Sequence, residues 1–145
     1  MIAFKIIAFV SLLSNPSHFA SRSTDQTKLL IEVDNIRHTN GQVMRIAICT
    51  KDDFLKDKKP YEYAMVEVRS GKITHTFSVP KGEYAVSVFH DLNANNILDK
   101  NFFGAPSEPY GFSRNYKPVM RAPRFDEVKL SMTQDKKINI SLIHP

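Results

Sequence analysis

Apolar and polar residues alternate along most of the chain beyond residue 25. Leu29, Ile31 and Val33 show this alternation first. Six further segments repeat it, at residues 44–48, 61–68, 73–79, 84–88, 128–132 and 138–142. A period of two places every second side chain on the same face of a β-strand. Seven such segments separated by turn residues predict an all-β protein, folded as a single antiparallel β-sandwich of about seven strands.

A turn at residues 80–82 leads into the fifth of these segments, whose first inward residue is Tyr84. In immunoglobulin-like and transthyretin-like sandwiches, a tyrosine at such a corner bonds its hydroxyl to the backbone just upstream. We therefore expect a sandwich of this kind, in which Tyr84 has a structural role. Val86 and Val88 are expected to face the core beside the apolar side chains of residues 138–142.

The beginning of the chain has a different character. Lys5 precedes a short apolar run at residues 6–13, and Pro16 and small residues follow it. This order is typical of a secretory signal peptide, and the run is shorter than the roughly 20 residues that cross a bilayer. We predict a signal peptide over residues 1–23 and a β-sandwich domain over residues 26–145. The alternative is a first core strand or a buried helix. The mature protein is then exported, periplasmic or extracellular, and does not span a membrane.

The chain carries 20 basic and 15 acidic residues, a formal net charge of +5 that favours anionic partners. Export argues against nucleic acid as that partner. The only cysteine, Cys49, excludes an intrachain disulfide and a cysteine-based metal cluster. Because Cys49 ends an apolar stretch, we expect a buried, inert thiol, with a reactive or intermolecular role as the alternative.

The most informative stretch is at residues 91–99. Oxygen-bearing side chains stand there at relative positions one, three, five and nine. With this spacing a tight loop surrounds a calcium ion, while a backbone carbonyl fills position seven. The predicted calcium ligands are the side chains of Asp91, Asn93, Asn95 and Asp99, the carbonyl of Ile97, and Glu108 as a further carboxylate.

Two positions of this loop bear on the calcium prediction. Position six normally holds glycine because the backbone there is left-handed, and Asn96 is the next most tolerant residue. Position twelve holds Phe102 in place of a bidentate glutamate, so we expect weak binding and take the last ligand from Glu108. Magnesium and zinc fit this ligand set less well. The alternative is a metal-free loop closed by asparagine turns.

Residues 100–124 form a long stretch without a strand pattern, and connections of this length are often functional. They combine aromatic and basic side chains, which suits an anionic, glycan or protein partner in the cell envelope. The candidate ligand-binding residues are Phe103, Tyr110, Phe112, Arg114 and Tyr116. The alternative is a cap whose aromatic side chains close one end of the sandwich.

Two stretches together resemble a known family. Residues 82–99 read Gly-Glu-Tyr-Ala-Val-Ser-Val-Phe-His-Asp-Leu-Asn-Ala-Asn-Asn-Ile-Leu-Asp, and residues 103–113 read Phe-Gly-Ala-Pro-Ser-Glu-Pro-Tyr-Gly-Phe-Ser. This pair resembles the bacterial exported family catalogued as domain of unknown function 2141, in which glycine usually stands at the position of Asn96. The loop is also similar to calcium loops in transthyretin-like repeats of bacterial surface proteins. These resemblances imply the sandwich and the ion, and no particular activity.

An enzymatic role is the alternative to a binding or structural module. A small envelope hydrolase acting on a glycan would use the acidic loop, with Asp99 and Glu108 as its carboxylate pair. His90 and Asp91 also suggest an acid–base pair, but adjacent strand residues point to opposite faces of a sheet. The histidines are otherwise scattered along the chain, and no serine stands in a nucleophile elbow. We therefore expect a module without catalytic residues.

Overall fold

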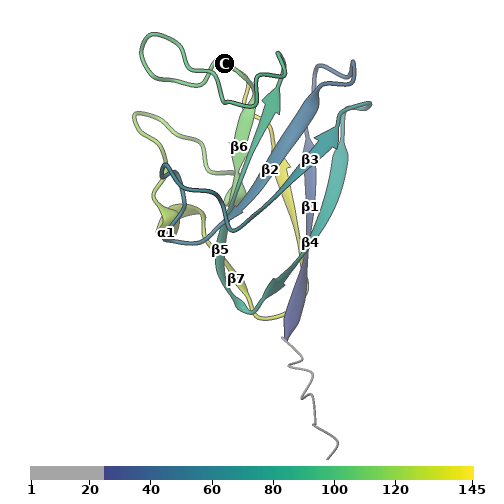
Figure 1. Cartoon of the computed structure of the whole chain (residues 1–145), viewed down its shortest axis with the longest axis vertical. Coiled ribbons are helices and arrows are strands. Elements are labelled where there is room, and N and C mark those ends of the chain that lie inside the picture. Colours follow the sequence, from purple (N-terminus) through teal and green to yellow (C-terminus); the bar gives the residue numbers. More distant parts are fainter. Residues whose placement is uncertain (1–24) are drawn as a thin grey trace, which may run out of the picture.

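The computed structural model describes residues 25–145, which form two β-sheets that share a hydrophobic core (Figure 1). The predicted signal peptide at residues 1–23 lies outside the described residues. The strands are, in chain order, β1 (Gln26–Asp34), β2 (Val43–Cys49), β3 (Glu62–Glu67), β4 (Ile73–Pro80), β5 (Gly82–Asp91), β6 (Tyr110–Phe112), β7 (Leu130–Met132) and β8 (Lys136–Ser141). Two short helical turns, η1 (Ser113–Asn115) and α1 (Phe125–Val128), lie between β6 and β7. Among residues 25–145, no helix is long and apolar enough to cross a membrane.

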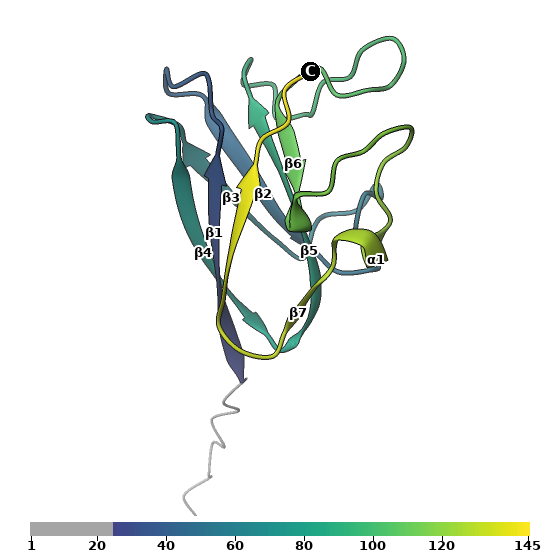
Figure 2. The same cartoon turned by 180° about the vertical axis from the view of Figure 1, so that it is seen from behind.

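The smaller sheet has the strand order β4–β1–β8, and Figure 2 shows it from the other side of the molecule. β1 pairs antiparallel with β4 and parallel with β8, so that Ile31 lies opposite His75 on one side and Ile138 on the other. Leu29, Ile31 and Val33 are fully buried, as their alternation predicts.

The larger sheet has the order β3–β2–β5–β6, and the short β7 pairs with the start of β5. All of these pairs are antiparallel. Ile46 of β2 lies opposite Val88 of β5, and both are buried. The protein is therefore mostly β, with two largely antiparallel sheets, as the sequence predicts.

The core between the sheets contains the side chains that the alternation places inward. Tyr84, Val86 and Val88 are buried there together with Ile140 and Leu142, while Ile138 packs against them half-buried. The Tyr84 hydroxyl donates a hydrogen bond to the carbonyl oxygen of Pro80 at 3.0 Å. This bond confirms the structural role predicted for Tyr84.

A second apolar cluster covers the outer face of β2 and β5. Phe54 is buried in it, with its ring edge-on to Phe112 and Phe125 at centroid distances of 6.2 and 6.1 Å. The Ser113 hydroxyl accepts a bond from the Val86 amide and donates one to the carbonyl of Val128, which fixes η1 and α1 to β5. The rest of the cluster consists of Cys49, Ala85 and Val128.

Cys49 lies in this cluster, so its predicted burial is confirmed. Burial, together with the nearby charge of Asp53, raises the pKa of the Cys49 thiol to about 12. The thiolate, which is the reactive form, is therefore strongly disfavoured at neutral pH.

Three details of the strand prediction are wrong. The structure has eight strands rather than about seven, because β6 lies within residues 100–124, where no strand is predicted. Val128 belongs to α1 rather than to the strand of Leu130 and Met132. The pairing of β1 with β8 is parallel, so the fold is not purely antiparallel.

Gly111 allows the short strand β6 to lie close to the core. A Cβ atom placed on Gly111 would lie 2.6 Å from the side chain of Ile140 and 3.3 Å from that of Val88. Only glycine therefore allows the backbone of β6 to lie this close to β8.

Candidate functional site

The loop 91–99 begins where β5 ends, beside the strand β2. Its first residue, Asp91, is fully buried. The Arg45 guanidinium of β2 donates to the Asp91 carboxylate with an Nε–Oδ2 distance of 2.8 Å. The amides of Asn95 and Asn96 donate to the two oxygens of the same carboxylate, at 3.2 and 3.0 Å. Asp91 thus fixes the first turn of the loop to the sheet.

The charge of Asp91 is compensated within the protein. Burial by itself would raise the pKa of Asp91, but the bonds from Arg45 and from the amides of Asn96 and Asn95 outweigh burial, so that the pKa lies below its ordinary value. Arg45 also donates to the side-chain oxygen of Asn96. The Arg45 guanidinium therefore compensates the negative charge of Asp91, a residue that the sequence predicts as a calcium ligand.

The side chains of Asn93, Asn95 and Asp99 converge on one another. Asn93 donates through its side-chain amide to the Asp99 carboxylate at 2.6 Å, and Asn95 donates to both Asp99 oxygens at 2.9 and 3.1 Å. The side-chain oxygen of Asn93 accepts a hydrogen bond from the backbone amide of Asn95, and the side-chain oxygen of Asn95 accepts one from the amide of Ile97. These are the asparagine turns of the metal-free alternative.

The backbone conformation of the loop agrees with the expected geometry. Asn96 has a φ of +70°, the left-handed conformation expected at position six, and Ala94 has a φ of +58°. The Ile97 side chain points outward and is 65% exposed.

Glu108 closes the base of the loop. It is buried, and its two carboxylate oxygens accept hydrogen bonds from the backbone amides of Leu92 and Asp99, at 2.8 and 3.1 Å. One side chain therefore joins both ends of the loop, while the amide of Ser107 donates to the carbonyl of Asp99. Glu108 is engaged by backbone donors rather than directed at the cluster of Asn93, Asn95 and Asp99.

The predicted calcium ligands thus divide into two groups. Asn93, Asn95 and Asp99 come together, and their oxygens would suit a hard cation once the two amides turned. Asp91 faces Arg45, and Glu108 faces backbone amides. Within residues 25–145 there is no cluster of three or more histidine, cysteine, aspartate or glutamate side chains arranged to hold a metal. Only Asp99 offers a carboxylate without a cationic partner at the centre of the loop.

The five candidate ligand-binding residues of the following segment also divide. Phe112 is buried, and Tyr110 and Tyr116 pack half-buried against the same outer cluster. They therefore cover the outer face of β2 and β5, whereas the cap expected as the alternative would close one end of the sandwich. Phe103 is instead 89% exposed, and Arg114 is also exposed, so only these two are open to a ligand.

Phe103 belongs to a tight, outward-pointing turn. The side-chain oxygen of Asn101 accepts the amides of Phe103 and Ala105 at 3.0 and 3.1 Å, and the amide of Gly104 donates to the Asn101 carbonyl at 2.9 Å. Phe102 lies beside Phe103, with the rings edge-on and 5.5 Å apart. We call Phe102 and Phe103 the first tip.

A second apolar tip, Val119 and Met120, follows in the same segment. These residues and those of the first tip are the four most exposed large apolar side chains of the described chain. Beyond Met120, Arg121 pairs through two nitrogens with the Glu127 carboxylate, at 2.8 Å each. This pair ties the loop to α1, and together with the bond from the Arg124 amide it lowers the pKa of Glu127 to about 2. The two loops that carry the tips extend from the same side of the sheets (Figures 1 and 2).

Within residues 100–124 the exposed charged side chains are all basic, while Asp99 and Asp126 flank this segment. Residues 100–124 contain five bases, all exposed, and their single acid is the buried Glu108. The bases are Lys100, Arg114, Lys117, Arg121 and Arg124. Among the described residues, Arg121 is the only one of these five with a salt-bridge partner. The surface of this segment is therefore apolar at its tips and basic around them.

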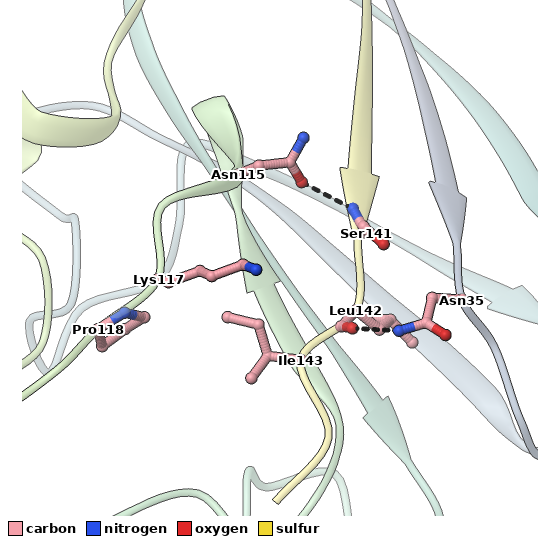
Figure 3. Close-up of a pocket in the computed structure, with 7 residues that line it drawn as sticks. All are labelled: Asn35, Asn115, Lys117, Pro118, Ser141, Leu142 and Ile143. Atoms are coloured by element: carbon pink, nitrogen blue, oxygen red, sulfur yellow. Dashed lines mark hydrogen bonds between the residues drawn. The ribbon is translucent and has the colours of Figure 1, made fainter.

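A shallow hollow of about 530 Å³ lies between Lys117 and Pro118, which precede the second tip, and the end of β8 (Figure 3). The side chain of Asn115 accepts the Ser141 amide, and that of Asn35 donates to the Leu142 carbonyl, both at 2.8 Å. Lys117 brings an ammonium group to this hollow, so it adds to the basic character of the same region.

Comparison with known proteins identifies the family. Residues 31–141 match the model of a family described as uncharacterized protein conserved in bacteria, DUF2141. The chain belongs to the DUF2141 family. No curated protein and no solved structure matches it. The family assignment covers both the loop 91–99 and the segment with the two tips.

Two parts of this DUF2141 site were not found from the sequence. Arg45 was missed because its position between Met44 and Ile46 indicates only an outward side chain, whereas its contact with Asp91 depends on the pairing of β2 with β5. The second tip was missed because Val119 and Met120 are not aromatic. Two adjacent apolar residues between Lys117 and Arg121 are the signal that the sequence offers.

Proposed function

We propose that this DUF2141 protein is an exported, immunoglobulin-like or transthyretin-like β-sandwich that binds a component of the bacterial cell envelope. Its ligand surface consists of the two tips and the bases around them. The signal-peptide pattern at residues 1–23 supports export.

One observation carries this proposal. Phe102, Phe103, Val119 and Met120 are each at least 88% exposed, on loops held in place by Asn101 and by the Arg121–Glu127 pair. Exposed large apolar side chains that form a patch mark interaction sites, and the loops that carry these four extend from the same side of the sheets (Figures 1 and 2). The exposed bases beside them give that surface a preference for anionic partners.

The alternative, a hydrolase that acts on a glycan, has less support. Its carboxylate pair would be Asp99 and Glu108, but Glu108 is buried and holds two backbone amides. His90, the nearest histidine to the loop, is fully buried as well. A general acid or base must reach the substrate, so these positions favour binding over catalysis.

The test is retention of the purified full chain on bacterial envelope fragments that contain both membrane and cell wall. The variant Phe102→Ser/Phe103→Ser removes the first tip, and Tyr63→Ser is its control. Tyr63 is 54% exposed on β3, a strand that belongs to neither tip. We expect the tip variant to lose retention by about tenfold or more, since it removes two phenylalanines that binding would bury, and the control to bind normally. Equal retention of both variants would contradict the proposal.

A second proposal concerns calcium, and the convergence of Asn93, Asn95 and Asp99 favours it. We propose that calcium binds weakly at this cluster, where the two asparagine side chains turn their oxygens towards the ion. Asp91, the Ile97 carbonyl and Glu108 complete the predicted ligand set. Because Arg45 and the backbone amides hold Asp91 and Glu108, affinity is expected at the weak end, on the order of 10⁻⁴ to 10⁻³ M. The ion would stabilise the loop that supports the first tip.

Thermal melts in millimolar calcium and in chelator test this second proposal. Calcium should raise the melting temperature of the wild type but not that of Asp99→Asn, because that substitution removes the uncompensated carboxylate. Asp126→Asn, on the exposed part of α1, is the control and should respond like the wild type. Identical melting temperatures of the wild type with calcium and with chelator would contradict calcium binding and favour the metal-free interpretation of the loop.

A further inference from the structure

We propose that the ligand of the two tips is the anionic surface of a lipid bilayer, into which Phe102, Phe103, Val119 and Met120 insert while the neighbouring bases contact lipid headgroups. This inference rests on the proposed binding function and names its partner. The docking is peripheral.

The exposure of the four apolar side chains is built into the fold. Phe102 and Phe103 are 97% and 89% exposed, although an apolar core lies within the same chain. The Asn101 side chain holds two amides of the turn, and Gly104 has a φ of +79°, which a residue other than glycine rarely adopts. The turn therefore presents the two rings outward in a fixed conformation.

The shape of the tips fits a fluid partner better than a folded one. The four side chains lie in loops. None of them lines the hollow beside Lys117, and none lines a second hollow between Phe54 and Arg124. A protein or glycan partner would need a complementary cavity for each tip, whereas acyl chains adapt to a protruding side chain. Amphipathic surfaces bind membranes through buried apolar area together with attraction to anionic lipids.

The charges complete this arrangement. Lys100 precedes the first tip by two residues, and Lys117 precedes the second tip by two. Both are exposed, and within residues 25–145 neither has a salt-bridge partner. The single acid of residues 100–124, Glu108, is buried and bound to amides. Basic side chains that lie near a membrane surface attract anionic headgroups.

The sequence contains no tryptophan, so a single introduced tryptophan reports on one position. Three full-chain variants are compared: Phe103→Trp for the first tip, Met120→Trp for the second, and Tyr63→Trp on β3 as the control. Each is titrated with vesicles of phosphatidylglycerol and phosphatidylcholine in equal parts, and with vesicles of phosphatidylcholine alone. Brominated acyl chains serve as a quencher that reaches only inserted side chains.

We expect both tip reporters to shift to shorter wavelength and to be quenched on the anionic vesicles, while the Tyr63→Trp control does neither. Adding Lys117→Gln to a tip reporter should raise the lipid concentration at half-maximal shift about fivefold on anionic vesicles. The response of the same reporter to vesicles of phosphatidylcholine alone should not change. Because the reporters sit on the tips, attachment of the chain to vesicles through another segment does not imitate this result.

Three results would overturn the inference. These are the absence of any tip-reporter response at saturating lipid, an equal response of all three reporters, and a shift of the tip reporters without vesicles as the protein concentration rises. The last result would identify a second copy of the chain as the occupant. If the tip reporters are silent on vesicles while the first tip is still needed for retention on envelope fragments, the membrane inference fails and the proposed binding function stands.

Discussion

His90 and Asp91 are neighbours at the end of β5, and both are fully buried. Asp91 receives a guanidinium and two backbone amides. Among the described residues, neither ring nitrogen of His90 has a hydrogen-bond partner. Burial lowers the pKa of His90, as do the nearby charges of His38 and His144, while Asp91 acts in the opposite direction. The fold therefore accommodates His90 in its neutral form.

This environment predicts that the protein loses stability as the pH falls from 7 towards 5. The pKa of His90 in the folded protein lies below its ordinary value of about 6.5. Over this range the unfolded chain takes up a proton that folded His90 does not, with a slope of at most about 1.4 kcal/mol per pH unit. Urea unfolding at several pH values measures it.

His90→Leu is the control for this prediction. It removes the titrating group and breaks none of the hydrogen bonds of the described residues, so its slope over the same pH range should be smaller. Equal slopes for the variant and the wild type would show that other groups cause the pH dependence.

At the scale of elements, the Arg45–Asp91 ion pair joins β2 to the loop that follows β5. Arg45→Leu should lower the free energy of unfolding by about 3 kcal/mol, because it leaves a buried carboxylate without its cation. Adding Asp91→Asn removes that charge, so the double variant should lose less than the sum of the two single losses. Additive losses, measured by chemical denaturation, would mean that the two side chains act independently.

The packing of β5 between the two clusters gives a second prediction. Val86 is fully buried in the main core, and Val86→Ala should lower the free energy of unfolding by about 1–3 kcal/mol. Val119→Ala, at the exposed second tip, is the matched control and should change it by less than about 0.5 kcal/mol. Similar losses for the two variants would contradict the assigned core.

The long strands were predictable because each buries one face, so its alternation is visible in the sequence. β6 escaped prediction because it has only three residues, and its position depends on the contact of Gly111 with β8. The place of Val128 in α1 was not predictable, because the turn α1 continues the apolar pattern of β7. The parallel pairing of β1 with β8 depends on topology, which alternation does not encode.

At the scale of the whole molecule, the position of the loop was predictable and its contacts were not. The spacing of oxygen-bearing residues located residues 91–99 and the left-handed Asn96. That Asp91 pairs with Arg45 and that Glu108 binds two backbone amides depends on segments brought together by folding. The aromatic residues of 100–124 looked alike in sequence, and only their burial separates Phe112 from Phe103.

Export is a property of the whole chain and has its own test. The signal-peptide pattern predicts that the mature protein begins between residues 21 and 24 and is recovered outside the cytoplasm. Fractionation followed by N-terminal sequencing measures both. Recovery of cytoplasmic protein that still begins at Met1 would contradict the predicted localisation.

The central claim is that the two tips form the binding surface, and methionine oxidation of the unmodified protein tests it most directly. Met120 on the second tip is 94% exposed, and Met65 on β3 is 58% exposed, so both should react with peroxide in the free protein. Their oxidation is followed by mass spectrometry with and without envelope fragments. The account predicts that bound envelope slows oxidation of Met120 severalfold and leaves Met65 unchanged. Unchanged oxidation of Met120, or protection of Met65 alone, would contradict it.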